Sequence, residues 1–219
     1  GAAEPHHVRY WSIGNENYGD WELGAKDAET WSRLVTEAAK LISRVDPDAQ
    51  LTAAALDDVN WNVKLLSRAG EKLRWISIHG YWDGLWQVDE PATYEQVCAM
   101  SNHTGDALRR VRALLTAMGL DKSIRIAFDE WNLRGWHHPN ARKREDYLGP
   151  RDRNDRNCVY TMADAVFSAC FLNTLLRNAD VVGMANFAPV VNTRGALYVH
   201  KEGIVKRTTF HVFDLYVNR

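Results

Sequence analysis

The chain has 219 residues, a length typical of one domain, and 46% of them are hydrophobic, which is enough to bury a substantial core. Its 27 basic and 28 acidic residues leave a net charge of −1. This balance argues against a polyanion such as nucleic acid, or an anionic membrane surface, as the partner, and it suits a neutral substrate better.

Short apolar runs alternate with longer amphipathic stretches along the chain. This alternation predicts βαβ units and therefore an α/β fold with a parallel sheet. The predicted strands are 7–13, 50–55, 75–81, 124–128 and 181–187. The predicted helices are 30–45, 58–69, one or two over 93–118 with a break near 102–105, 156–178, and one that starts within 208–216.

The connection 132–155 has no clear periodicity, and loops of this length are usually functional or disordered. It contains Trp136, His137 and His138, followed by a basic run at 142–144. We expect the Trp-His-His part to lie near a ligand. The basic run is better explained as a solvated part of the loop.

Aromatic residues are abundant, with nine tryptophans and eight tyrosines. Most are expected in the core, but such rings also stack on the C–H faces of sugars. Cys98, Cys158 and Cys170 form neither a CxxC nor a zinc pattern, so we expect reduced, buried thiols. No apolar run has the ~18 residues of a membrane span, and no signal peptide is visible. Because the chain begins Gly-Ala-Ala-Glu-Pro rather than with Met, the missing signal says little; the location we expect is cytoplasmic.

Two predicted strands end in a carboxylate with aromatic neighbours. The first is followed by Asn15 and Glu16, and the fourth ends in Asp129-Glu130-Trp131-Asn132. Catalytic groups of α/β barrels lie at the C-terminal ends of strands, and glycoside hydrolysis needs two carboxylates, one protonated and one ionised. Either glutamate alone is better explained as a surface residue, but the two together favour a catalytic pair.

A third strand end carries His79 and Tyr81, which point to the same face because they are two residues apart. The sequence leaves two interpretations open for them: polar groups of a site, or a satisfied core histidine and a buried tyrosine. Trp82 and Trp86 follow, either as sugar-stacking residues or as packing.

Several motifs resemble one known family in their order and spacing, over essentially the whole chain. They are WSIGNENYGDW (Trp11–Trp21), ISIHGYW (Ile76–Trp82), IAFDEWNLRGW (Ile126–Trp136), MANFAPVVNTRG (Met184–Gly195) and FHVFDLY (Phe210–Tyr216). They resemble the α-L-arabinofuranosidases of glycoside hydrolase family 51, in the large clan of retaining (β/α)₈ barrel glycosidases.

The resemblance implies roles for individual residues. Glu16 would be the general acid/base on the fourth barrel strand, and Glu130 the nucleophile on the seventh. Asn15 would bind the 2-hydroxyl of the sugar, and Tyr81 on the sixth strand would orient the nucleophile. The other expected substrate-binding residues are Trp21, Trp136, His79 and Asn186.

The resemblance also implies which part of the fold is present. Residues 1–219 would form a partial (β/α)₈ TIM barrel, strands four to eight, without the N-terminal strands and the C-terminal β-sandwich domain of the family. A barrel that lacks three strands has two open edges, so this piece alone is not expected to be a stable enzyme. The family forms oligomers, so a homo-oligomer is an expectation for the full-length protein only.

The implied chemistry is hydrolysis with retention, through a covalent glycosyl-enzyme, which predicts the two carboxyl groups roughly 5 Å apart. The substrate would be an arabinose-containing oligo- or polysaccharide. Two carboxylates suffice for this reaction, so neither a metal nor an organic cofactor is expected.

Three alternatives to this function were weighed. The same scaffold could act as a β-glycanase on glucan or xylan, or the chain could be a catalytically incompetent fragment. Because both carboxylates are present, the second alternative is disfavoured for the parent protein. A metal hydrolase that uses His6, His7, His137 and His138 is disfavoured too, because adjacent histidines rarely share one ion.

Overall fold

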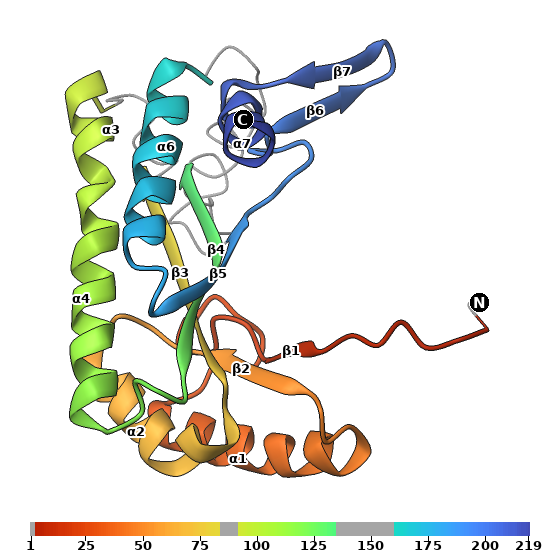
Figure 1. Cartoon of the computed structure of the whole chain (residues 1–219), viewed down its shortest axis with the longest axis vertical. Coiled ribbons are helices and arrows are strands. Elements are labelled where there is room, and N and C mark those ends of the chain that lie inside the picture. Colours follow the sequence, from red (N-terminus) through yellow and green to blue (C-terminus); the bar gives the residue numbers. More distant parts are fainter. Residues whose placement is uncertain (1–2, 84–91, 135–159) are drawn as a thin grey trace. The chain divides into compact units, whose positions relative to one another are not determined.

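The main element of the fold is a five-stranded sheet with the strand order β1-β2-β3-β4-β5 (Figure 1). The structure, a computed structural model, describes residues 3–83, 92–134 and 160–219. The strands are β1 (Tyr10–Ile13), β2 (Gln50–Ala54), β3 (Trp75–Asp83), β4 (Arg125–Arg134) and β5 (Val182–Phe187). β1 pairs parallel with β2, and β2 pairs parallel with β3. The predicted α/β class with a parallel sheet is therefore confirmed.

The described helices match those predicted from the hydrophobic periodicity. They are α1 (Ala28–Val45), α2 (Val59–Ala69), the short 3-10 helix η1 (Gly70–Lys72), α3 (Tyr94–Met100), α4 (Asn102–Ala117), α6 (Met162–Arg177) and α7 (Thr208–Asn218). The region 93–118 holds two helices that meet at Ser101, close to the predicted break. Among the helices described, none is both long and apolar enough to cross a membrane.

Polar side chains fix where four helices begin. Each accepts a hydrogen bond from a backbone N–H of the first turn, which that turn cannot satisfy internally. For α3 and α6 the third helical residue also accepts from the backbone of the cap, which completes a capping box. The capping residues are Asp27 for α1, Asp58 for α2, Thr93 for α3 and Thr161 for α6.

The chain divides into two compact units, each with its own core. The first unit comprises Gly1–Ile78, Leu108–Ala127 and Asp180–Met184. In it α1 packs against α2, and the buried Trp31 donates a hydrogen bond from Nε1 to the carbonyl oxygen of Ala54 at 2.9 Å. This bond ties the helix to the end of β2, next to the turn that follows β1.

The second unit comprises His79–Ala107, Phe128–Ala179 and Ala185–Arg219, and its core is largely aromatic. Trp131 stacks on Phe171 with ring centroids 3.9 Å apart. Trp82 lies against Phe167 and Phe171 at 5.3 and 5.6 Å, so of its two predicted roles it takes packing rather than sugar stacking. α6 packs against both α3 and α7.

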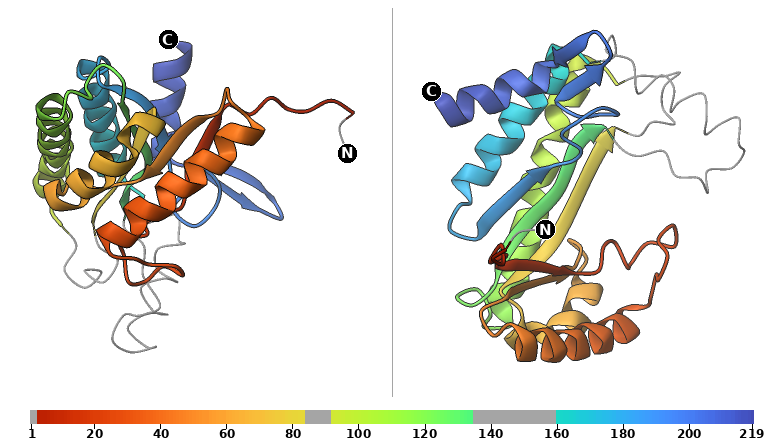
Figure 2. Two further views of the ribbon diagram at one scale, coloured as in Figure 1. Left: turned by 90° about the horizontal axis from the view of Figure 1, so that it is seen from below. Right: turned by 90° about the vertical axis from the view of Figure 1, so that its right-hand side faces the viewer.

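A β-hairpin precedes α7 and was not predicted. Its strands β6 (Leu197–His200) and β7 (Gly203–Lys206) pair antiparallel and form a second sheet (Figures 1 and 2). All four residues of β7 are exposed. The strand therefore lacks the alternation of apolar and polar residues by which a half-buried strand is predicted, and this is why the hairpin was missed.

The cysteines agree with the prediction in part. Cys98 and Cys170 are free thiols, but each is partly exposed rather than buried. Cys158 lies outside the described residues.

Candidate active site

The strands that carry the predicted site residues are longer than the sequence suggested. β4 runs to Arg134, so Glu130 lies within the strand and not at its end. Trp131 and Leu133 are buried on one face of the strand, while Glu130 and Asn132 share the other because side chains alternate. Likewise β3 continues beyond Tyr81 to Asp83.

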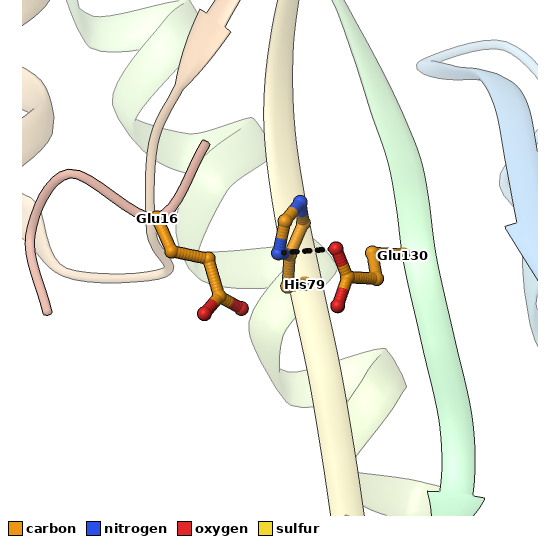
Figure 3. Close-up of side chains that lie close together, drawn as sticks. All are labelled: Glu16, His79 and Glu130. Carbon is orange, nitrogen blue, oxygen red and sulfur yellow. Dashed lines mark ion pairs between the residues drawn. The ribbon is translucent and has the colours of Figure 1, made fainter. Parts of the chain in front are cut away.

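Glu130 is held by two side chains of β3 within the second unit. The Tyr81 hydroxyl donates a hydrogen bond to Oε1 of Glu130 at 2.5 Å. Nδ1 of His79 lies 3.4 Å from Oε2, as Figure 3 shows with a dashed line. Each carboxylate oxygen therefore has its own partner, which fixes the plane of the group.

His79 also faces a second carboxylate. Its Nε2 lies 3.6 Å from Oδ1 of Asp129, and its side chain is only 7% exposed. His79 is therefore buried, as expected of a core histidine, and also lies beside two carboxylates, as expected of a polar residue of a site. Asp129 was not predicted as a site residue, although it directly precedes Glu130.

Asn132, on the same face of β4 as Glu130, connects the strand to the segment after β5. Its Nδ2 donates to the carbonyl oxygens of Ala188 and Arg194, both at 3.1 Å. Arg194 is fully buried, and its guanidinium carbon lies 5.8 Å from the centre of the Tyr81 ring. Nothing in the sequence singles out Arg194 beyond its place in the VNTRG part of a motif.

A second arginine holds the backbone around Arg194. Arg207 is buried and donates to the carbonyl oxygens of Thr193 at 2.7 Å and Gly195 at 3.0 Å. Its guanidinium carbon lies 4.0 Å from the ring centre of Tyr160, and the Tyr160 hydroxyl donates to the same Thr193 oxygen at 3.0 Å.

Glu16 belongs to the first unit, in the turn after β1. It has a left-handed backbone, with φ +43°, and its carbonyl oxygen accepts from the N–H of Gly19 at 2.7 Å. Nε1 of Trp21 donates to Oε2 of Glu16 at 2.8 Å. Two of the predicted site residues, Glu16 and Trp21, are thus in direct contact, with Trp21 as the hydrogen-bond donor.

Asn17 organises this turn and was missed by the sequence analysis. Its Oδ1 accepts from the backbone N–H of Asn15 at 3.0 Å, and its Nδ2 donates to the carbonyl oxygen of Gly24 at 3.3 Å. The side chain is buried, and its backbone oxygen accepts from the N–H of Lys26 at 2.8 Å. One side chain thereby connects both ends of the loop that displays Glu16.

The remaining predicted residues are placed as follows. Asn15 is exposed in the Glu16 turn, and Asn186 is exposed on β5. Trp86, Trp136, His137 and His138 lie outside the described residues. The first unit thus brings Glu16 and Trp21 together, and the second brings together Glu130, Tyr81 and His79.

Comparison with known proteins finds α-L-arabinofuranosidases among the relatives of this chain. A family model described as the α-L-arabinofuranosidase C-terminal domain matches residues 129–219. A curated relative from Halalkalibacterium halodurans, named intracellular exo-α-(1→5)-L-arabinofuranosidase, is 30% identical over 97% of this chain and 43% of its own length. The chain therefore spans less than half the length of that relative.

Solved structures agree with this grouping. The α-L-arabinofuranosidase of Thermotoga maritima, solved as an arabinose complex, matches with a TM-score of 0.83 and 29% identity over all of this chain and 41% of its own. The family 51 α-L-arabinofuranosidase of Thermotoga petrophila matches with a TM-score of 0.77 and 28% identity, over the same shares of the two chains. The motifs, the fold and these relatives agree: over its whole length the chain is similar to part of the α-L-arabinofuranosidases of glycoside hydrolase family 51.

Proposed function

We propose that the protein carrying this chain is a retaining, exo-acting α-L-arabinofuranosidase that removes arabinofuranosyl residues from arabinose-containing oligo- and polysaccharides. The names of the relatives support this activity, and the word intracellular in one of them supports a location inside the cell. We further propose that residues 1–219 supply strands four to eight of a (β/α)₈ barrel. Five strands that follow one another in the sheet, with helices between them, support this assignment.

The observation that carries the proposal is the environment of Glu130. A nucleophilic carboxylate must be ionised and must present one oxygen to the anomeric carbon. The Tyr81 hydroxyl donates a hydrogen bond to Oε1 of Glu130 at 2.5 Å and so holds the carboxylate in one orientation. An ordinary surface glutamate is not expected to have a tyrosine hydroxyl at one carboxylate oxygen and a buried histidine beside the other.

The proposed reaction has two steps. In the first, a Glu130 oxygen bonds to the anomeric carbon as the glycosidic C–O bond breaks, and Glu16 gives its proton to the departing oxygen. In the second, Glu16 takes a proton from water, the water oxygen bonds to the anomeric carbon, and the ester bond to Glu130 breaks. Two inversions give net retention.

The neighbouring residues have supporting roles in this scheme. The Trp21 N–H fixes the side chain of Glu16, which needs one orientation for both proton transfers. Tyr81 and His79 orient Glu130. By the family pattern Asn15 would bind the 2-hydroxyl of the sugar. Trp136 and Asn186 would complete the binding site.

Azide rescue of a Glu130→Ala variant tests the nucleophile, in the whole protein that carries these residues. The variant should lose turnover of an aryl α-L-arabinofuranoside, because no group can form the covalent intermediate. Azide should then restore product as the β-azide, since it attacks from the side that Glu130 occupied. The matched control is Glu37→Gln, an exposed glutamate on α1 that pairs with Lys40. An inactive Glu130 variant that azide fails to rescue, beside an active control, would contradict the assignment.

A panel of nitrophenyl glycosides separates this activity from the alternative of a β-glycanase. The α-L-arabinofuranoside should be cleaved with a kcat/KM at least about tenfold above that for the β-D-glucoside and β-D-xyloside, the difference expected when contacts to a hydroxyl are lost. A higher kcat/KM for either β-glycoside would contradict the proposed substrate. It would not contradict the assignment of Glu16 and Glu130 as the catalytic pair.

A further inference from the structure

We propose that Arg194 is a positioning residue for the reaction: its buried guanidinium holds the Tyr81 ring, and through the Tyr81 hydroxyl it sets the orientation of Glu130. The inference rests on the proposed function, because it concerns the same nucleophile. It extends that function by a residue of the VNTRG segment to which the catalytic scheme gives no role.

The first step is the burial of a charge. Arg194 is 0% exposed, so its side chain cannot contact a sugar directly. A guanidinium in the interior loses its hydration and is stable only where other groups compensate for that loss. The face of an aromatic ring is one such group, because its quadrupole attracts a cation within about 6 Å of the ring centre. Tyr81 meets this condition at 5.8 Å.

The second step is the rigidity of the segment that carries Arg194. Three successive carbonyl oxygens, those of residues 193 to 195, accept side-chain hydrogen bonds. Arg207 donates to the first and third, and Asn132 donates to the second. A Cβ added to Gly195 would lie 2.4 Å from the carbonyl oxygen of Val190, so the chain is tightly packed here. These hydrogen bonds and the close packing at Gly195 hold the backbone before and after Arg194. They therefore fix the direction in which its side chain leaves the backbone.

The third step links the ring to the chemistry. The Tyr81 hydroxyl donates to Glu130 at 2.5 Å, so a small rotation of the ring would lengthen this bond or misalign it. A cation over the ring also draws electron density from the phenol and makes its O–H a stronger donor. Arg194 therefore acts on Glu130 without contacting it, by orienting Tyr81 and strengthening its hydrogen bond.

A double-mutant cycle in the whole protein tests this chain of contacts. The variants are Arg194→Met and Arg194→Gln, which remove the charge, Arg194→Lys, which keeps it, and each neutral change combined with Tyr81→Phe. For each variant kcat and KM on an aryl α-L-arabinofuranoside are measured together with the Tm. Arg112→Met is the control, because Arg112 forms an ion pair with Asp180 on the surface of the first unit.

We expect the neutral variants to lower kcat by about tenfold or more with KM changed by less than about threefold, and the Lys variant to keep kcat within about threefold of wild type. In the Tyr81→Phe background the neutral change should have less than about a twofold effect, because the contact acts through the hydroxyl that is already gone. A purely structural role would instead lower Tm and reduce kcat equally in both backgrounds.

Unchanged kcat in a folded neutral variant, or an equal loss in both backgrounds, would overturn the inference. If neither neutral variant folds, the Arg194→Lys variant tests the inference. A loss of kcat of more than about tenfold in this variant would overturn the positioning role, and a loss within about threefold at unchanged KM would support it. A wild-type protein with no arabinofuranosidase activity would contradict the proposed function instead, so the two failures are distinguishable.

Discussion

Tyr81 and Glu130 form a hydrogen bond of 2.5 Å between neighbouring strands, from the phenol hydroxyl to Oε1 of the carboxylate. The other oxygen of Glu130, Oε2, lies 3.4 Å from the imidazole of His79. Tyr81 and His79 lie two residues apart on β3 and therefore share one face of the strand. The spacing of the ISIHGYW motif thus places one polar side chain beside each carboxylate oxygen.

Replacing Tyr81 by Phe should lower kcat by about tenfold to a hundredfold. A hydrogen bond to a charged group contributes about 1.5–3 kcal/mol, and here it fixes the orientation of the Glu130 carboxylate. KM for an aryl arabinofuranoside should change little, because the bond does not hold the sugar. Steady-state kinetics on the whole protein measures both constants. A Tyr81→Phe variant with the wild-type kcat would show that the bond has no catalytic consequence.

Replacing Glu16 by Ala should impair substrates according to their leaving groups. Without the acid, cleavage of an oligosaccharide should almost stop, whereas an aryl glycoside with a very good leaving group should still form the glycosyl-enzyme because it needs no proton. Azide should speed the second step and give the α-azide, with retention. This is the opposite anomer from that expected with Glu130→Ala.

The two azide products give an internal control for these assignments. If Glu16→Ala yielded the β-azide and Glu130→Ala the α-azide, the roles of the two residues would be exchanged. If both variants lost activity equally on every leaving group, Glu16 would not be the acid.

Replacing Gly14 by Ala should destabilise the turn that displays Glu16. Gly14 has φ +70°, and a Cβ there would lie 2.0 Å from Oδ1 of Asn17 and 2.4 Å from the Trp31 ring. The side chain would therefore displace Asn17, which holds both ends of the loop, at a cost of about 2–4 kcal/mol from backbone strain and overpacking. Tm and kcat should fall together.

Gly119 provides a matched control for this change. It has nearly the same backbone, with φ +71°, but nothing lies within 4 Å of an added Cβ. Gly119→Ala should therefore cost only the backbone term, about 1–2 kcal/mol, and leave kcat unaltered. Equal losses of stability in Gly14→Ala and Gly119→Ala would show that displacing Asn17 does not lower the stability.

Much of the fold was predictable because its elements have strong local signals. The apolar face of α1 and the alternation of strands with helices both follow from the sequence. The ends of β3 and β4 were not predictable. Both strands continue past the residues proposed to act in catalysis, and the polar Asn132 within β4 is stabilised by carbonyl oxygens of a segment more than fifty residues away.

The residues proposed to react could be named from the sequence, whereas the residues that support them could not. Glu16, Glu130 and Tyr81 belong to motifs with recognisable spacing. Asp129, Asn17 and Arg194 lie in the same motifs, but their roles depend on tertiary contacts that leave no pattern in the sequence. A buried arginine in particular contradicts the expectation that charged residues lie at the surface.

The acid dependence of stability offers a prediction that is independent of catalysis. Glu29 of α1 accepts hydrogen bonds from Arg33, one turn along the helix, at 3.1 Å and from Arg68 of α2 at 2.8 Å. The hydrogen bond from Arg33, helped by the charge of Arg68, holds the pKa of the Glu29 carboxyl below its ordinary value of 4.5. A group with a lowered folded-state pKa contributes stability above its unfolded pKa and loses it as the pH falls through the folded value.

Glu29→Gln should therefore lower the Tm slightly near about pH 7, and the difference from wild type should vanish as the pH falls below about 4.5. Both partners are exposed, so the effect is small and should shrink in about 1 M salt, which screens surface charges. Thermal unfolding followed at several pH values measures it, and Glu37→Gln on the same helix, which breaks only a one-helix pair with Lys40, serves as the control. A Tm difference for Glu29→Gln that persisted in acid would mean that the side chain stabilises α1 and α2 by packing, because its charge would be gone under those conditions.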